Sequence, residues 1–335
     1  MLEAIGKREL FVLDGLGIRL QGTYHPAAEL YSKMPEHREG ADRLGVLFLN
    51  SLSLPRAASG DSAVQWADSI AELGYPAFRI DLPGLGDSAG KASTDLLDLV
   101  NAGCFASVAS AAVRQLVDRF GLAGMVIFGH CAGSVSALYA SAECPECKGL
   151  ILLDTYFHLP QASRPRVRQE LSDWARRSRV GRFLSNSYDR ARNLRLILRG
   201  KALPANTNIQ LLDCWKQVAS AGLPILLLQA PGIKAQGSKP RVGQFDYVEH
   251  ILKLSGRKSR VSVEFVESAD HSFANREGRA AVQSHIAAWL VSHFLLKDFN
   301  LSAEGAPSQR VRENQSASRK SQNAPTDKCC AMESR

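Results

Sequence analysis

Two kinds of hydrophobic pattern run along the chain, and they predict regular structure. Short apolar runs bounded by turn residues predict buried strands at 44–49, 149–154, 223–229 and 261–266, with further strands at 75–80 and 125–128. Apolar residues at helical spacing predict helices at 63–73, from about 94 to 120, and at 276–296. Residues 8–25 alternate on either side of a turn at 14–17, which predicts a β-hairpin. Strands alternating with helices predict an α/β protein with a mainly parallel sheet covered on both faces.

Two segments depart from this alternation and suggest the domain organisation. Residues 157–221 fall between two predicted core strands and have helical patterns, so we expect a helical cap over the carboxyl edge of the sheet. Residues 301–335 are polar, rich in Ser, Asn, Gln and charge, and predict a disordered tail. The core domain would then consist of residues 1–156 and 222–300.

Composition narrows the class of protein. A chain of 335 residues with 45% hydrophobic content can bury a full core. Its apolar runs fall short of the roughly 18 residues of a membrane span, and the N-terminal residues lack the apolar core of a signal peptide. We therefore expect a cytoplasmic protein without an integral membrane segment, in which the seven cysteines stay reduced.

The stretch 125–135 concentrates the candidate chemistry. An apolar run ends in Gly129-His130-Cys131-Ala132-Gly133, and a small-residue helix pattern follows. A strand that turns sharply into a helix must hold one residue at positive φ with its side chain in the open. Glycines two before and two after that residue are needed because strand and helix approach too closely for a Cβ. The pattern predicts a nucleophile elbow at Cys131, against the alternative of a cysteine in an ordinary β-to-helix turn.

The order of motifs over residues 8–298 resembles that of the α/β-hydrolases. The Asn50-Ser51-Leu52 turn, the loop Asp81-x-x-Gly-x-Gly-Asp-Ser88, the elbow and Ser268-Ala-Asp-His-Ser-Phe273 follow one another in that family's order. The second and last of these motifs are similar to the serine-aminopeptidase-like branch. Residues 67–81 together with a Cys elbow look like the hydrolases associated with exosortase A systems, which occur near bacterial exopolysaccharide genes. The resemblance implies an α/β-hydrolase fold with a helical cap and esterase or thioesterase chemistry.

Cys131 and His271 are the expected nucleophile and base. A thiol is a stronger nucleophile when a helix N-terminus or an imidazole increases its thiolate fraction, and the elbow supplies the helix. His271 follows the last predicted strand by five residues, where the histidine loop of the family reaches back toward the elbow. The alternative for His271 is a loop histidine without a partner.

The acid is less well defined by the sequence. The resemblance places it in the loop after the 223–229 strand, but residues 230–239 contain no carboxylate. Asp154, at the end of the strand after the elbow helix, and Asp246, in a longer loop, are the two replacements. Asp154 could instead cap a strand end, and Asp246 could be a solvated helix residue. An acid orients the imidazole, but a thiol depends on it less than a hydroxyl does, so a Cys-His dyad is a third option.

The resemblance also implies an oxyanion hole made by the amides of Ala132 and Leu52. The usual His-Gly of that turn is Asn50-Ser51 here, which leaves the second donor open. Residues 160–201 hold twelve basic residues against three acidic ones, more net positive charge than the whole chain's +8. Such a density of positive charge would attract an anionic substrate, unless these basic residues only form a solvated helical face. The expected substrate contacts are Arg56, Arg176, Arg177 and Arg179.

Other functions are disfavoured. Cys144-Pro-Glu-Cys147 has metal or redox spacing, but no second pair or histidine cluster accompanies it, so we expect neither metal nor cofactor. The arginines lack a nucleic-acid motif or interleaved aromatics, so no nucleic-acid partner is expected. The sequence favours a cysteine-dependent hydrolase acting on a small-molecule or carrier-linked acyl ester or thioester. The alternatives are an acyltransferase with the same residues and a non-catalytic scaffold, and a homodimer is an open option.

Overall fold

A computed structural model describes residues 8–28, 43–52, 54–159, 203–204, 206–231, 245–256 and 259–295. The strands in these residues are β1 (Glu9–Asp14), β2 (Arg19–His25), β3 (Leu44–Leu49), β4 (Ala77–Ile80), β5 (Gly124–His130), β6 (Cys147–Leu153), β7 (Pro224–Gln229) and β8 (Arg260–Phe265). The α-helices are α2 (Ser62–Glu72), α3 (Leu96–Asn101), α4 (Ala106–Phe120), α5 (Ala132–Glu143), α8 (Ile209–Ser220), α9 (Tyr247–Ser255) and α10 (Arg276–Leu290). A short 3-10 helix, η1 (Ser59–Asp61), precedes α2, and a π-helical turn, η4 (Val291–Leu295), follows α10.

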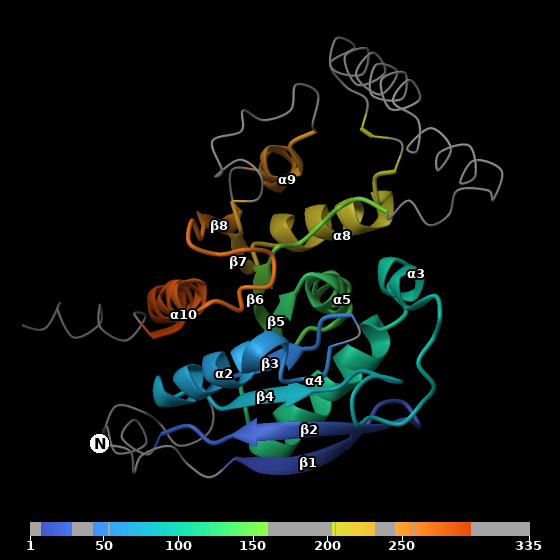
Figure 1. The fold of residues 1–335 in the computed structure, drawn as a ribbon, viewed down its shortest axis with the longest axis vertical. Coiled ribbons are helices and arrows are strands. Elements are labelled where there is room, and N and C mark those ends of the chain that lie inside the picture. The colour runs from blue at the N-terminus through green and yellow to red at the C-terminus, as the bar shows by residue number, and fades with distance from the viewer. Residues whose placement is uncertain are drawn as a thin grey trace, which may run out of the picture. The chain divides into compact units, whose positions relative to one another are not determined.

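The strands form one sheet in the order β1-β2-β4-β3-β5-β6-β7-β8 (Figure 1). The pairs β1–β2 and β2–β4 are antiparallel, and all the other neighbours are parallel. Every residue of β5 is buried, because this central strand is covered on both faces. The parallel register puts the carboxyl ends of β3, β5, β6 and β7 at one edge of the sheet, which is where the expected functional residues follow.

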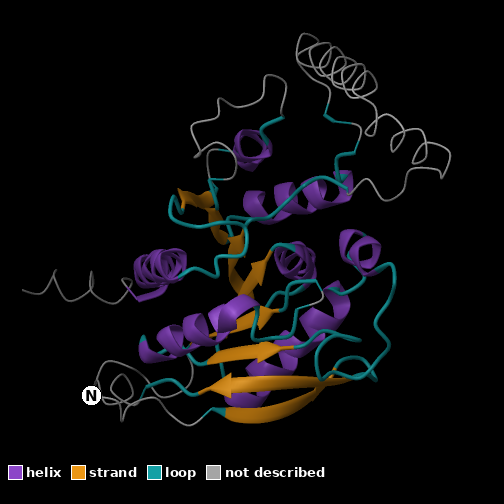
Figure 2. Cartoon of the chain, in the orientation of Figure 1, coloured by secondary structure: helices purple, strands orange, loops and turns teal. Residues whose placement is uncertain are grey.

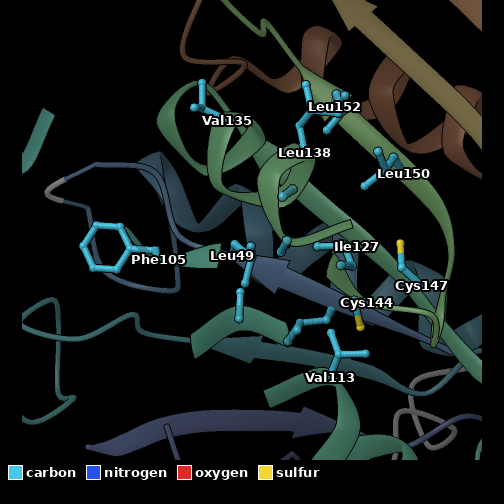
Figure 3. Close-up of a cluster of buried hydrophobic side chains, with 14 of the residues drawn as sticks. Leu49, Phe105, Val113, Ile127, Val135, Leu138, Cys144, Cys147, Leu150 and Leu152 are labelled. Carbon is cyan, nitrogen blue, oxygen red and sulfur yellow. The ribbon is translucent and has the colours of Figure 1, made fainter. Parts of the chain in front are cut away.

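Helices cover both faces of the sheet (Figure 2). On one face α2 and α10 pack together, and the Trp66 indole N–H of α2 donates to the carbonyl of Arg279 at 3.2 Å. On the other face α5 packs between α4 and α8. The core there includes an aliphatic cluster: Figure 3 shows Leu49, Ile127, Val135, Leu138, Leu150 and Leu152 together.

Two of the expected elements differ from the structure. The helical region from about 94 to 120 is two helices, α3 and α4, because Gly103 adopts φ 74° between them. A Cβ there would also lie 3.2 Å from the Tyr139 ring. The strand predicted as buried at 261–266 is the edge strand β8, whose residues are half-buried or exposed. Its alternation of Val261 and Val263 with polar residues is typical of a strand covered on one face only.

The structure describes the segment expected to form the cap, 157–221, only in part. Its last helix, α8, contributes Leu211, Trp215 and Val218 to the main hydrophobic core, and is therefore part of the layer beside α5. The Trp215 indole N–H donates to the Ile251 carbonyl at 3.1 Å, which joins α8 to α9. Most of the remaining cap, 160–202, and the predicted tail, 301–335, lie outside the described residues. Among the helices that the structure describes, none is long and apolar enough to cross a membrane.

Candidate active site

The elbow conformation predicted from the glycine spacing is present between β5 and α5. Cys131 has φ 53° and ψ −115°, is half-buried, and donates its N–H to the Leu153 carbonyl at 2.8 Å. A Cβ on Gly129 would lie 2.4 Å from the carbonyl carbon of Gly133. A Cβ on Gly133 would lie 2.8 Å from the carbonyl oxygen of Leu49. Both glycines are therefore required for strand and helix to meet at this angle.

The structure brings His271 to Asp154. His271 lies in the loop after β8, and its Nδ1 is 2.6 Å from Oδ2 of Asp154. Asp154 directly follows β6 at φ 48°, and its amide donates to the Leu228 carbonyl at 2.8 Å. Its other carboxylate oxygen, Oδ1, accepts from the Ala230 amide at 3.0 Å. Backbone groups at the ends of β6 and β7 therefore fix the carboxylate that faces His271.

The electrostatics of His271 link it to Cys131 as well. The pKa of His271 is raised to about 10, first by its hydrogen bond with Asp154 and then by a side-chain interaction with Cys131. Negative charge on either partner favours the imidazolium form. The ring is 63% exposed, so water also solvates it. Cys131, His271 and Asp154 thus form one cluster at the carboxyl edge of the sheet.

Asp246, the other candidate acid, has a structural contact instead. It is the N-cap of α9, and its Oδ1 accepts from the Glu249 amide at 3.0 Å. Capping satisfies a helix N–H that has no intrahelical partner. Of the two candidates, Asp154 is the one whose carboxylate contacts His271.

The expected oxyanion donors lie at the start of α5 and after β3. Ala132 is the first residue of α5, where an N–H has no carbonyl partner within the helix. Leu52 adopts φ 27° in the turn that follows β3. Asn50 holds this turn: its Nδ2 donates to the Leu54 carbonyl at 3.0 Å, and its Oδ1 accepts from the Leu82 amide at 3.2 Å. Asn50 is therefore a buried residue that holds the loop in place through its side-chain hydrogen bonds.

Arg56, expected to contact an anionic substrate, is paired with carboxylates of its own chain. Its guanidinium binds the buried carboxylate of Asp81 and lies 2.7 Å from Asp87, while its Nε donates to Thr23 at 3.0 Å. Its amide donates to Asp81 Oδ1 at 2.7 Å. The charge is already neutralised, and Arg56 anchors the loop after β3. The other expected contacts, Arg176, Arg177 and Arg179, lie outside the described residues.

The thiols of Cys144 and Cys147 are buried among aliphatic side chains (Figure 3). Cys144 Sγ donates to Glu146 and Cys147 Sγ donates to the Gly149 carbonyl. Burial raises the pKa of Cys144 to about 11 and that of Cys147 to about 12. Such thiols are poor nucleophiles and poor metal ligands, so this pair is part of the core.

One residue of the site was missed by sequence reasoning. His130, treated as the variable position of the elbow, is 6% exposed and donates Nε2–H to the His271 carbonyl at 2.7 Å. Burial lowers its pKa, which keeps the ring neutral. Its ring packs edge-on against Phe273, with centroids 5.6 Å apart. In the sequence, the signal for this contact was a histidine directly before Cys131, together with an aromatic residue, Phe273, two positions after His271.

Comparison with known proteins agrees with this fold. A family model described as alpha/beta hydrolase fold matches residues 47–186. No curated protein matches the sequence. The chain is similar to the solved structure of DcsB in complex with its substrate analogue, at 13% identity and a TM-score of 0.54, over 86% of this chain and 99% of that one.

Two further solved structures show the same likeness. The alpha/beta hydrolase GrgF from Penicillium sp. sh18 has 15% identity and a TM-score of 0.54, over 87% of this chain and 100% of that one. The esterase Pf2001 of Pyrococcus furiosus has 12% identity and a TM-score of 0.53, over 86% of this chain and 92% of that one. Sheet order, elbow and these matches together show that the chain has the α/β-hydrolase fold.

Proposed function

We propose that the protein is a cysteine-dependent hydrolase that cleaves an ester or thioester through an acyl-enzyme. The observation that supports this most directly is the 2.6 Å contact between His271 Nδ1 and Asp154 Oδ2, in a histidine that also interacts with Cys131. The contact orients the imidazole so that Nε2 is the nitrogen available to the nucleophile and to the leaving group.

In the proposed reaction, His271 takes the proton that the Cys131 thiol gives up. The sulfur attacks the substrate carbonyl carbon, and the amides of Ala132 and Leu52 stabilise the oxyanion. When the tetrahedral intermediate collapses, His271 gives its Nε2 proton to the departing alcohol or thiol. His271 then takes a proton from water, which attacks the thioester of the acyl-enzyme and releases the acid and the thiolate.

The substrate class rests on the sequence. The basic residues of 160–201, Arg176, Arg177 and Arg179 among them, favour an anionic or carrier-linked acyl group. The resemblance to exosortase-associated hydrolases supports a role in a bacterial polysaccharide or lipid pathway, and we propose that the reaction occurs in the cytoplasm. Pf2001, whose fold is similar, is an esterase, which is in keeping with ester chemistry. If an acceptor other than water reaches the acyl-enzyme, the same residues perform an acyl transfer.

The test is to trap the acyl-enzyme. Wild-type protein is incubated with p-nitrophenyl esters and N-acetylcysteamine thioesters, and peptide mass spectrometry locates any acyl group. We expect the adduct on Cys131, release of the free acid, and loss of both in Cys131→Ala. Cys104→Ala, which removes an exposed thiol, is the matched control. Turnover that survives in Cys131→Ala would exclude this mechanism, and absence of turnover together with an unmodified Cys131 would favour a scaffold.

A further inference from the structure

The strand β1 lies at one edge of the sheet, with β2 as its neighbour (Figure 1). Two of its side chains, Leu10 and Val12, are 77% and 41% exposed, and they alternate with the buried Phe11 and Leu13. Leu10 and Val12 therefore share the open face of the strand. An edge strand that also carries exposed apolar side chains is a template on which a second strand can pair.

The hydrogen bonds of the β1–β2 hairpin show which backbone groups face the open edge. Gly15 and Ile18 exchange both of their backbone hydrogen bonds, at 2.6 and 3.2 Å. In an antiparallel ladder, hydrogen-bonded residue pairs alternate with pairs that are not hydrogen-bonded. When the register is followed from this pair, the backbone N–H and C=O groups of Asp14, Val12 and Leu10 point away from β2. These residues present their backbone groups to the edge of the sheet.

The position at Asp14 is already closed. The side chain of Gln115, from α4, accepts from the Asp14 N–H at 3.1 Å and donates to the Asp14 carbonyl. A side chain that caps an edge strand in this way stops further pairing at that point. Among the described residues, no such bond is made to the backbone of Leu10 or Val12. The open part of the edge is therefore confined to these two residues.

A second copy of β1 fits this edge. In antiparallel pairing about a two-fold axis, Leu10 lies opposite Val12 of the second copy, and each such pair exchanges two backbone hydrogen bonds. The opposed side chains are apolar and lie on the same face. The next pair along the strands is Arg8 opposite Asp14, which carry opposite charges. Both side chains are exposed, although Arg8 also pairs with Asp68 of its own chain at 2.5 Å.

Two neighbouring registers are less favourable. A shift that sets Leu10 opposite Leu10 of the second copy brings charged Arg8 against apolar Val12 and loses the charge pair. A shift that sets Val12 opposite itself brings Leu10 against Asp14, whose backbone is already bonded to Gln115. The pairing of Leu10 with Val12 is therefore the register that uses both open backbone positions and matches the side chains.

We propose that β1 is a homodimer interface, in which two copies pair this strand antiparallel and join their sheets through Leu10 and Val12. This interaction surface does not depend on the proposed hydrolytic activity. Interfaces of small area are typical of weak or transient complexes, so the dimer should have a Kd on the order of micromolar.

The experiment is sedimentation velocity of the full chain at concentrations from well below to well above micromolar. Wild-type protein should change from monomer to dimer over this range. Val12→Pro removes an N–H that faces the edge but keeps the bonds to β2, and should raise Kd at least about tenfold. Leu10→Lys places a charge on the edge and should have a similar effect. The control is Leu16→Lys, in the hairpin turn at 62% exposed, which should keep the wild-type Kd.

A charge exchange tests the register. Arg8→Asp and Asp14→Arg should each raise Kd, because like charges then face each other across the axis, and the double variant should recover the wild-type value. The contact of Arg8 with Asp68 lies within one chain, so its loss affects monomer and dimer alike.

Three results would overturn the proposal. Wild-type protein that stays monomeric at every concentration has no such interface. A dimer whose Kd is unchanged in Leu10→Lys uses another surface, and this variant should stay folded because the side chain it replaces is exposed. A double charge variant that remains as weak as the single variants would exclude the pairing of Arg8 with Asp14.

Discussion

His130 donates its Nε2–H to the backbone carbonyl of His271 at 2.7 Å, which ties the residue before Cys131, the proposed nucleophile, to the proposed base. The elbow and the histidine loop are far apart in sequence, yet this bond fixes one against the other. His130 is therefore a positioning residue of the site, and its effect on the reaction should pass through His271.

We expect His130→Phe to lower kcat about tenfold with little change in KM, because the histidine loop loses its anchor while the ring volume is kept. The orphaned carbonyl should also cost about 1–3 kcal/mol of unfolding free energy. Steady-state kinetics and denaturant unfolding measure the two effects. His130→Gln can still donate a hydrogen bond and should recover part of kcat. Equal activity of the Phe and Gln variants would contradict the positioning role.

Asp154→Asn should lower kcat by about 100-fold, less than in a serine enzyme, because a thiol depends less on the acid. Asp154 is also the largest cause of the raised His271 pKa, which is about 10 in the folded protein. His271 must be protonated to serve the leaving group, so activity is lost as pH rises through that pKa. In Asp154→Asn, the alkaline limb of the pH–rate profile should move to lower pH.

Asp246→Asn is the matched control for this variant. Asparagine is as good an N-cap as aspartate, so α9 should remain folded. Its kcat and pH–rate profile should equal those of wild-type protein. A larger loss of activity in Asp246→Asn than in Asp154→Asn would reverse the assignment of the acid.

Iodoacetamide at neutral pH should label Cys131 about tenfold faster than Cys104, although Cys104 is the more exposed thiol. Exposure alone predicts the opposite order, so faster labelling of Cys131 must come from His271 and the helix N-terminus. The thiols of Cys144, Cys147 and Cys214, whose pKa values burial raises to about 11, 12 and 12, should label last. Peptide mass spectrometry gives each rate. His271→Ala should bring Cys131 to the rate of Cys104 or below, and an unchanged rate would argue against activation.

Stability should fall in mild acid because of His25, which is 1% exposed. Its Nδ1 contacts Asp68 at 2.7 Å and its Nε2 accepts from Arg79 at 2.8 Å, an arrangement that requires the neutral ring. Burial, and then the charge of Arg79, lower its pKa from 6.5 to about 4. The unfolded chain therefore binds the proton first, so stability present above pH 6.5 is lost as pH falls toward 4, by on the order of 3 kcal/mol.

This loss is measured by denaturant unfolding of wild-type protein between neutral pH and the folded-state pKa of His25, about 4. His25→Gln should be less stable at neutral pH but should lose less on acidification. His285→Gln, on α10, is the control, and its unfolding free energy should depend on pH as that of wild-type protein does. If the pH dependence of unfolding free energy is unchanged in His25→Gln, other groups cause the acid sensitivity.

Arg56→Met should cost about 3 kcal/mol, because it leaves the fully buried carboxylate of Asp81 without its partner. The loss should appear in unfolding free energy rather than as a higher KM for an anionic substrate. Lys253→Met, which removes an exposed pair with Glu249, should cost less than about 1 kcal/mol. A selective rise in KM with unchanged stability would restore the role of Arg56 as a substrate contact.

The alternation of strands and helices, and the elbow, could be predicted from sequence because they depend on local rules. Gly129 and Gly133 are required by contacts within a few residues of the chain, so their spacing carries the geometry. The edge position of β8 could also have been predicted, since Val261 and Val263 alternate with polar residues. The split of the 94–120 region was signalled by Gly103 alone, a weak indication in an otherwise helical pattern.

The partners of charged and polar groups could not be predicted, because they come from distant segments. Arg56 meets Asp81 and Asp87 across a loop, so its neutralisation depends on the fold. The choice of Asp154 over Asp246 depends on which carboxylate the His271 loop reaches. Trp215 packs in the core because α8 lies against α5, a relationship that the amphipathic pattern of α8 does not specify.

The placement of Asp154 directly after β6 has a consequence for how this site could change over evolutionary time. The proposed nucleophile and the proposed acid both lie within one strand–helix–strand unit, residues 124–154, and the β5–β6 register pairs His130 with Leu153 just before them. The loop after β7 then carries no reacting group, since its residues 230–239 contain no carboxylate. Apart from Ala230, whose amide holds Asp154, changes in this loop leave the proposed reacting groups in place, so substrate preference could change there while Cys131, His271 and Asp154 are inherited intact.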